Sequence, residues 1–226
     1  SAPMSRGPRL VLLGKQGAGK GTQAARLSER YGIEHVSTGD LFRAAAAAGT
    51  PAGREAEEYM NRGDLVPDDL TLRIVEDRFA EDGLIDHGFV LDGFPRTLQQ
   101  AEKLEEVLDG HPLDLVINLD VPTAIVLDRI AGRRVCEQCG TTYHVNAPPK
   151  EDWTCDVCGG AVVHREDDTE DAVMRRLELY EEETVPIIDF YRKVGKLVVV
   201  EGTGDGDGVF ARLVAQVDQR LKPLQT

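Results

Sequence analysis

A glycine-rich loop near the start of the chain has the residues needed to bind phosphate. Its sequence is Gly14-Lys15-Gln16-Gly17-Ala18-Gly19-Lys20-Gly21-Thr22, between an apolar run and a helical pattern. Glycines let the backbone turn tightly and aim its N–H groups at phosphate oxygens, and a helix N-terminus adds partial positive charge. Lys20 adds a full charge. A plain glycine turn is the alternative, which the lysine disfavours. The loop predicts a nucleotide site formed by Gly17, Ala18, Gly19, Lys20, Gly21 and Thr22.

A carboxylate, Asp92, ends a second apolar run at Phe89-Val90-Leu91. In a nucleotide enzyme such an acid orients the waters of a bound Mg²⁺. The alternative is an aspartate that caps a turn with Gly93. The glycine-rich loop earlier in the chain favours the Mg²⁺ role.

Four cysteines, all that the chain has, form the pairs Cys136/Cys139 and Cys155/Cys158 with fifteen residues between the pairs. Each Cys-x2-Cys pair can give two thiolates to one metal ion, and two pairs complete a tetrahedron. Zn²⁺ suits this site best, although the spacing also fits iron. Disulfides and unliganded cysteines are the alternatives. Because protein atoms would fill all four positions, we expect a structural metal.

The net charge of the chain limits the kinds of molecule that it can bind. The chain has 26 Lys+Arg against 40 Asp+Glu, a net charge of −14, which repels nucleic acid and anionic membranes but not a small anion in a local basic site. The segment 132–169 is itself net −3. No apolar run is long enough to span a bilayer, and no export signal is recognisable. We therefore expect a cytoplasmic protein with no nucleic-acid or membrane partner.

The spacing of apolar runs predicts an α/β fold for most of the 226 residues. Strands are expected at residues 10–13, 33–36, 88–91, 115–119 and 197–200. Helices are expected at residues 20–31, 41–48, 68–80, 97–108, 123–130 and 171–191. Alternating strands and helices predict a five-stranded parallel sheet with helices on both faces, as in P-loop NTPases.

Two segments fall outside this pattern. Residues 1–8 are expected to be an N-terminal tail, with Ser1-Ala2-Pro3 before Met4 typical of a cloning remnant. Residues 132–169, called here the cysteine insert, hold every cysteine and have no long amphipathic pattern. They predict a small antiparallel insert of hairpins resembling a zinc ribbon.

Taken together, these motifs resemble the adenylate kinase family of nucleoside monophosphate kinases, in its long-lid, zinc-binding form. The most specific motif is Asp92-Gly93-Phe94-Pro95-Arg96. The resemblance extends from about Leu10 to the C-terminus and includes, in order, residues 17–23, 37–41, 91–97, 120–122, 128–134, 165–168 and 201–203.

The resemblance implies reversible in-line transfer of the γ-phosphoryl group of Mg-ATP to AMP, giving two ADP, by a monomer that maintains adenine nucleotide balance. It implies a core of residues 9–36, 67–131 and 170–226, a monophosphate-binding segment of residues 37–66, and a closing lid made by the cysteine insert. Phosphoryl transfer depends mainly on positioning and on charge stabilisation, so no protein nucleophile is needed.

The resemblance also implies roles for single residues. Besides the loop, ATP would contact Arg129, Arg133, Thr142, Tyr143 and Gly204. AMP would contact Thr38, Arg43, Asp64, Leu65, Val66, Gly93, Phe94, Pro95, Arg96, Gln100, Arg165 and Arg176. The residues implied at the transferring group are Lys20, Asp92, Arg96, Arg133, Arg165 and Arg176. The zinc ligands would be Cys136, Cys139, Cys155 and Cys158.

Two positions bear on the glycine-rich loop. Lys15-Gln16 replaces the small residue and proline common in this family, which changes loop rigidity and adds a charge near the nucleotide. Gly21 stands where an ordinary P-loop has a hydroxyl residue, as in this family, so Mg²⁺ would be held through water and nucleotide oxygens.

Two other functions stay open at this point. A related kinase could use another acceptor base, although Thr38 and Gln100 favour adenine. A zinc-ribbon binding module on an inactive P-loop domain is the second alternative, and the intact Lys20, Asp92 and Arg96 argue against it.

Overall fold

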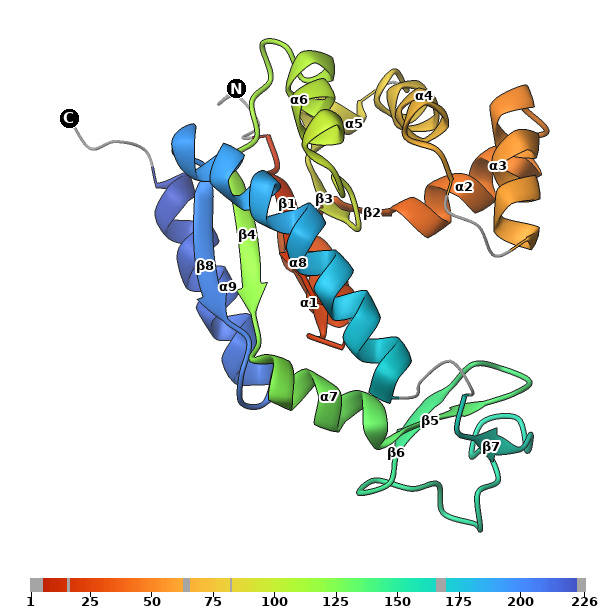
Figure 1. Cartoon of the computed structure of the whole chain (residues 1–226). Coiled ribbons are helices and arrows are strands. Elements are labelled where there is room, and N and C mark those ends of the chain that lie inside the picture. The colour runs from red at the N-terminus through yellow and green to blue at the C-terminus, as the bar shows by residue number, and fades with distance from the viewer. Residues whose placement is uncertain (1–5, 16, 63–65, 82, 166–169, 223–226) are drawn as a thin grey trace. The chain divides into compact units, whose positions relative to one another are not determined.

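The computed structural model describes residues 6–15, 17–62, 66–81, 83–165 and 170–222 (Figure 1). The chain divides into two units, which are described separately. The first comprises Ser1–Gly14, Gly19–Asp120 and Glu183–Thr226. The second comprises Lys15–Ala18 and Val121–Glu182.

The first unit contains the five-stranded parallel sheet that the sequence predicts. Its strands are β2 (Glu34–Ser37), β3 (Phe89–Asp92), β1 (Arg9–Gly14), β4 (Leu115–Asp120) and β8 (Leu197–Glu201), in that spatial order. All neighbouring pairs are parallel. The central strand β1 is buried along its whole length, as expected for a strand covered on both faces.

The register of the strands decides which residues meet at the carboxyl edge of the sheet. Leu12 of β1 pairs with Asp92 of β3, and Ser37 of β2 pairs with the same Asp92 from the other side. In open parallel sheets ligands bind outside the carboxyl ends of the strands. The pairing therefore places Asp92 at this edge beside the end of β1, where the glycine-rich loop begins.

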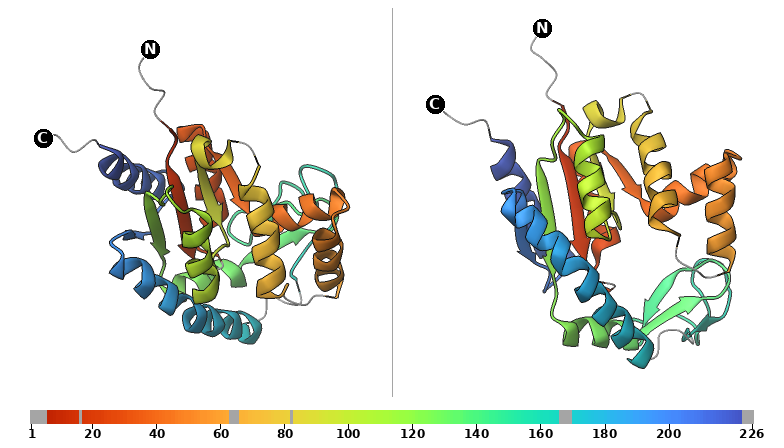
Figure 2. Two further views of the ribbon diagram at one scale, coloured as in Figure 1. Left: turned by 90° about the horizontal axis from the view of Figure 1, so that it is seen from above. Right: turned by 45° about the horizontal axis from the view of Figure 1, so that its top comes forward.

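Helices cover both faces of this sheet (Figure 2). On one face α1 (Lys20–Tyr31) contacts α9 (Gly206–Leu221). On the other face, Val11, Leu91 and Val116 from the strands join one apolar cluster with Leu104 and Tyr191. The last two residues come from α6 (Leu98–Val107) and from the second half of α8 (Glu170–Lys193).

Side-chain caps explain where several helices begin. Ser37, Thr50, Thr97 and Asp205 each accept a hydrogen bond from the backbone N–H three residues later, which satisfies one of the unpaired donors of the first turn. These caps start α2 (Thr38–Ala47), α3 (Pro51–Asn61), α6 and α9. The remaining helices of this unit are α4 (Asp68–Phe79) and α5 (Leu84–His87).

Three of these helices, α3, α5 and α9, are not predicted by the sequence analysis. Helix α9 buries Val209, Leu213 and Val217, a four-residue spacing typical of one helix face. Glycines at positions 206 and 208 obscure its start, because glycine is a poor helix former. Helix α2 also begins three residues earlier than predicted, because Ser37 caps it.

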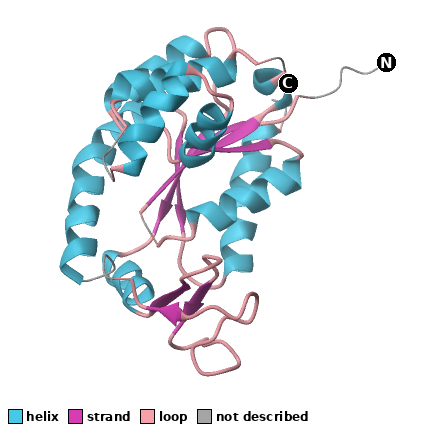
Figure 3. Cartoon of the chain, turned by 90° about the vertical axis from the view of Figure 1, so that its right-hand side faces the viewer, coloured by secondary structure: helices cyan, strands magenta, loops and turns pink. Residues whose placement is uncertain are grey.

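The second unit contains α7 (Thr123–Ala131), the first half of α8 and a three-stranded antiparallel sheet. The strands are β6 (Thr142–His144), β5 (Arg133–Cys136) and β7 (Val162–Val163), in that spatial order. Figure 3 shows that loops make up most of the chain around these short strands. The predicted antiparallel architecture of the cysteine insert is thus confirmed.

None of the helices that the structure describes has the length and apolar content to cross a membrane.

Close packing of α2 on α3 generates a stability prediction at Gly53. A Cβ atom there would lie 2.2 Å from the carbonyl oxygen of Ala45. Gly53→Ala should therefore lower the free energy of unfolding by about 1–3 kcal/mol, because one helix must shift. Urea unfolding monitored by circular dichroism measures this change.

The matched control is Gly206→Ala, whose Cβ would come no closer than 3.7 Å to the atoms around it. Equal stability of the Gly53→Ala variant and the wild type would contradict the packing argument.

Candidate nucleotide site and candidate metal centre

The glycine-rich loop has the backbone conformation that its glycines permit. Gly17 and Gly19 have φ angles of 81° and 85°, in the left-handed region that favours glycine. Gly19 immediately precedes α1, and within the described residues no side chain caps that helix. Its first N–H groups and its positive end are therefore suited to bind an anion.

The structure brings together Lys20 and Asp92, which are 72 positions apart in the sequence. Lys20 Nζ forms an ion pair with Asp92 Oδ1. His35 Nε2 lies 3.1 Å from the other oxygen, Asp92 Oδ2. A Cβ at Gly21 would lie 3.7 Å from that same oxygen, so the first turn of α1 faces the carboxylate.

The electrostatics of Asp92 follow from these partners. Only 8% of the residue is exposed, and burial alone would raise the pKa of its carboxyl group. The hydrogen bond with His35 and the charge of Lys20 outweigh burial and bring the pKa below its usual value. Asp92 is therefore ionised at neutral pH, as an acid that holds Mg²⁺-bound water must be. The sequence analysis did not identify His35.

A second group of predicted residues meets next to Asp92. Gly93 has a φ angle of 86°, and a Cβ on it would lie 2.9 Å from Thr38 Oγ1, so a glycine is required there. Arg96 Nε donates a hydrogen bond to the carbonyl of Gly93 at 2.8 Å. Gln100 Oε1 accepts one from the backbone N–H of Arg96 at 2.7 Å. Thr38, Gly93, Arg96 and Gln100 thus form one connected set.

Asp68, which the sequence analysis missed, completes this set. Gln100 Nε2 donates to Asp68 Oδ1 at 2.7 Å, and Thr97 Oγ1 donates to Asp68 Oδ2 at 3.3 Å. Both ends of the Gln100 amide are therefore bonded to protein, and only 3% of the residue is exposed. Gln100 therefore stabilises the turn that contains Arg96.

The other predicted AMP contacts have varied surroundings. Arg43 is exposed and forms an ion pair with Asp40 at 2.5 Å. Phe94 is buried in the apolar cluster, so only its backbone could reach a ligand, and the partly buried Val66 packs against the same cluster. Asp64 and Leu65 lie outside the described residues.

In the second unit, the loop is fixed to α7 and to the residues before it. Arg129 Nη1 donates to the carbonyl of Gly17 at 3.2 Å. Lys15 Nζ donates to the carbonyl of Val121 at 2.9 Å. Lys15, the residue that departs from the family loop, therefore stabilises the loop by a hydrogen bond to this backbone carbonyl.

Further residues are predicted to contact ATP, or, for Arg165 and Arg176, AMP and the transferring group. Thr142 and Arg165 are exposed, and Arg133 is partly buried at the start of β5. The side chain of Arg176 lies outside the described residues. In the first unit, Gly204 has a φ angle of 100° and follows Thr203, whose carbonyl accepts a hydrogen bond from Arg212 at 2.8 Å.

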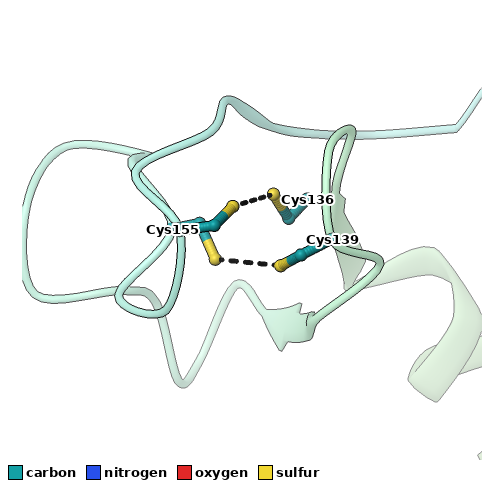
Figure 4. Close-up of side chains that lie close together, drawn as sticks. Cys136, Cys139 and Cys155 are labelled. Atoms are coloured by element: carbon teal, nitrogen blue, oxygen red, sulfur yellow. Dashed lines mark hydrogen bonds between the residues drawn. The ribbon is translucent and has the colours of Figure 1, made fainter.

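The four cysteines form one cluster, and Figure 4 shows three of them, Cys136, Cys139 and Cys155, close together. Their sulfur atoms all lie within 4.8 Å of one another. The distance between the sulfurs of Cys136 and Cys158 is 3.4 Å, and that between Cys139 and Cys155 is 3.6 Å. Zn–S bonds of about 2.3 Å place the corners of a tetrahedron roughly 3.8 Å apart. The cluster therefore fits a four-thiolate metal ion, and no disulfide joins these cysteines.

Hydrogen bonds to two of the sulfurs favour the thiolate forms that a metal needs. Thr141 Oγ1 lies 3.0 Å from Cys139 Sγ, and this hydrogen bond lowers the pKa of the Cys139 thiol. Tyr143 Oη lies 3.4 Å from Cys155 Sγ. That hydrogen bond is the main cause that lowers the pKa of Cys155 to about 6. Tyr143, predicted as an ATP contact, therefore has its hydroxyl group at the cysteine cluster.

The metal centre predicts a specific effect of Cys155→Ser. The variant should lose bound zinc and melt about 5 °C or more below the wild type, while the parallel sheet of the first unit still folds. Differential scanning calorimetry and elemental analysis measure the two quantities. Val157→Ser changes a neighbouring side chain that is 75% exposed, and it should leave both unchanged. A Cys155→Ser protein with wild-type melting temperature and metal content would contradict the assignment.

The low pKa of Asp92 predicts a pH-dependent effect of Asp92→Asn. A carboxyl group with a folded pKa below its unfolded value of 3.8 contributes stability above that value and loses it as the pH falls through the folded pKa. At neutral pH the variant should lose about 1–3 kcal/mol of unfolding free energy. The difference should shrink below about pH 4 in urea unfolding. A pH-independent difference would show that the charge of Asp92 is not its cause.

Comparisons with known proteins identify the family of this chain. Residues 12–196 match the family model described as adenylate kinase. The chain is 50% identical to an adenylate kinase of Thermodesulfovibrio yellowstonii, with 94% of this chain and all of that protein aligned. It is 49% identical to one of Archaeoglobus fulgidus, over 93% of this chain and 98% of the relative. It is 50% identical to an adenylate kinase of Bacillus subtilis, over 89% of this chain and 94% of the relative. The chain belongs to the adenylate kinase family.

Proposed function

We propose that this protein is an adenylate kinase that reversibly transfers the γ-phosphoryl group of Mg-ATP to AMP, giving two molecules of ADP. The observation that supports this most directly is the ion pair of Lys20 with Asp92 at the carboxyl edge of the sheet. This ion pair brings the lysine expected to bind phosphate next to the carboxylate expected near Mg²⁺. The turn that contains Arg96 follows Asp92 directly.

On the donor side, the glycine-rich loop and the start of α1 would hold the ATP phosphates. Lys20 would contact the β- and γ-phosphates. Mg²⁺ bound with ATP would neutralise charge on the phosphate oxygens, and ionised Asp92 would orient its waters. The family resemblance supports further ATP contacts by Arg129, Arg133, Thr142, Tyr143 and the carbonyl of Gly204.

On the acceptor side, residues 37–66 would bind AMP together with the turn after β3. The hydrogen bonds of Gln100 with Arg96 and Asp68 keep this turn in place. Arg43 would reach the AMP phosphate by exchanging its exposed partner Asp40, an ion pair worth about 0–1 kcal/mol at most. Thr38 and Gln100 are proposed near the adenine.

Arginines would stabilise the transferring group. The planar guanidinium can bind two phosphate oxygens at once, which suits a charge spread over three oxygens. Arg96, Arg133, Arg165 and Arg176 are proposed for this role. Water competes with AMP as the acceptor, so a lid formed by residues 132–169 would protect the reaction.

The metal centre is proposed to hold Zn²⁺ in a structural role, with Cys136, Cys139, Cys155 and Cys158 as ligands. Unpaired thiols fit a reducing compartment, which supports a cytoplasmic location. We also propose that the enzyme acts as a monomer.

Purified protein given ATP, Mg²⁺ and AMP should form ADP, with AMP a better acceptor than UMP, CMP or GMP. Lys20→Met should lower kcat/KM by about 10²- to 10³-fold, because a charge that stabilises the transferring group is lost. Lys193→Met, which removes an exposed lysine from the last turn of α8, is the matched control.

Two results would contradict the proposal. If ADP did not form above background, the kinase function would be wrong. If another nucleoside monophosphate were the better acceptor, the proposed specificity for AMP would be wrong. The proposed phosphoryl transfer would still hold.

A further inference from the structure

Two hydroxyl groups from one short segment face the cysteine cluster. Thr141 immediately precedes β6, and its carbonyl accepts a hydrogen bond from Cys136 N at 2.9 Å, which continues the pairing of β5 with β6. Residues 141 and 143 are two apart, so their side chains share one face of the strand. Both are partly buried, whereas Thr142 between them is exposed.

Each hydroxyl group contacts a different cysteine pair. Thr141 Oγ1 lies 3.0 Å from the sulfur of Cys139, in the first pair. Tyr143 Oη lies 3.4 Å from the sulfur of Cys155, in the second pair. The segment 141–143 therefore connects the two halves of the metal centre.

The direction of the Tyr143 hydrogen bond follows from its other partner. The backbone N–H of Asp156 donates to Tyr143 Oη at 2.9 Å, so the phenol oxygen is already an acceptor there. Its own proton is then available to Cys155, and a metal-bound thiolate can only accept. The ring is fixed as well, because Tyr143 packs against Cys136, Cys155 and Val162.

We propose that Thr141 and Tyr143 are positioning residues of the metal centre, whose hydroxyl groups donate hydrogen bonds to the thiolates of Cys139 and Cys155. Four thiolates around one Zn²⁺ leave a net charge of −2, which donors to sulfur offset. Groups in contact with metal ligands orient the ligands and tune their donor strength. This inference concerns the metal centre and does not depend on phosphoryl transfer.

The inference also separates the roles of adjacent residues on β6. The hydroxyl group of Tyr143 is committed to Cys155 and Asp156, so a nucleotide contact at this position would use its backbone or ring. Thr142 lies on the opposite, exposed face, where its side chain can reach a ligand. The metal would thereby hold the segment predicted to contact ATP.

The test compares zinc affinity in variants that lose one hydroxyl group each. Tyr143→Phe keeps the ring, and Thr141→Val keeps the shape of the side chain. Zinc-loaded proteins are titrated with the chelating dye 4-(2-pyridylazo)resorcinol, without nucleotide. Each variant should bind zinc about 10-fold more weakly than the wild type. Thr141→Ser, which keeps the hydroxyl group, should bind zinc nearly as tightly as the wild type.

A matched control removes a tyrosine hydroxyl group far from the metal in sequence. Tyr31 Oη donates to Asp218 at 2.7 Å, so Tyr31→Phe also deletes one hydrogen bond. Its zinc affinity should equal that of the wild type.

Co²⁺ substitution supplies a second readout. The Tyr143→Phe and Thr141→Val proteins should keep the intensity of a four-thiolate charge-transfer band, but the band should move to lower energy because the thiolates lose a donor. Zinc affinities within twofold of the wild type, an unshifted band, or an equal loss in Tyr31→Phe would overturn the inference. A wild-type protein that binds no zinc would overturn the metal centre and this inference together, whatever its kinase activity.

Discussion

Parallel pairing of β1 with β3 places Asp92 beside the strand that leads into the glycine-rich loop, and the ion pair with Lys20 depends on this register. A shift of one residue would turn Asp92 toward the opposite face of the sheet, because side chains alternate along a strand. The turn with Gly93, Arg96 and Gln100 follows Asp92 directly and would move with it. The proposed donor and acceptor sites therefore share one structural constraint, which the apolar pairing of two buried strands supplies.

The parts of this fold that depend on local pattern were predictable. Five strands, the glycine-rich loop and the spacing of the cysteine pairs are all visible within short segments. Helix α9 was missed because glycines at positions 206 and 208 obscure its start, and α3 was missed because the cap at Thr50 was not recognised. The partners His35 and Asp68 were missed for a different reason: the hydrogen bond from Gln100 to Asp68 joins residues 32 positions apart. Such contacts arise from tertiary packing, and no local periodicity encodes them.

An acidic chain can still bind anionic substrates if its basic side chains can exchange their carboxylate partners for phosphate. The proposed basic residues differ in how strongly they are paired. Arg43 forms an exposed ion pair with Asp40, which is screened by solvent and is readily exchanged for phosphate. Lys20 is paired with the largely buried Asp92, where the low dielectric strengthens the attraction. Bound Mg²⁺ and phosphate would replace this attraction with two others, since Asp92 would face the metal's waters and Lys20 the phosphate.

The cysteine insert has a small buried core that a bound metal ion would stabilise. Its buried apolar cluster consists of Cys136, Cys155 and Val162, with Tyr143 packed against them. Trp153 and Val157 are exposed on the same insert. Segments of this size bury too little apolar surface to fold unaided, and metals or disulfides commonly compensate. Two of the three buried residues are themselves proposed zinc ligands. Binding of the proposed metal would therefore complete this core, and the hydroxyl groups of Thr141 and Tyr143 would link it to β6.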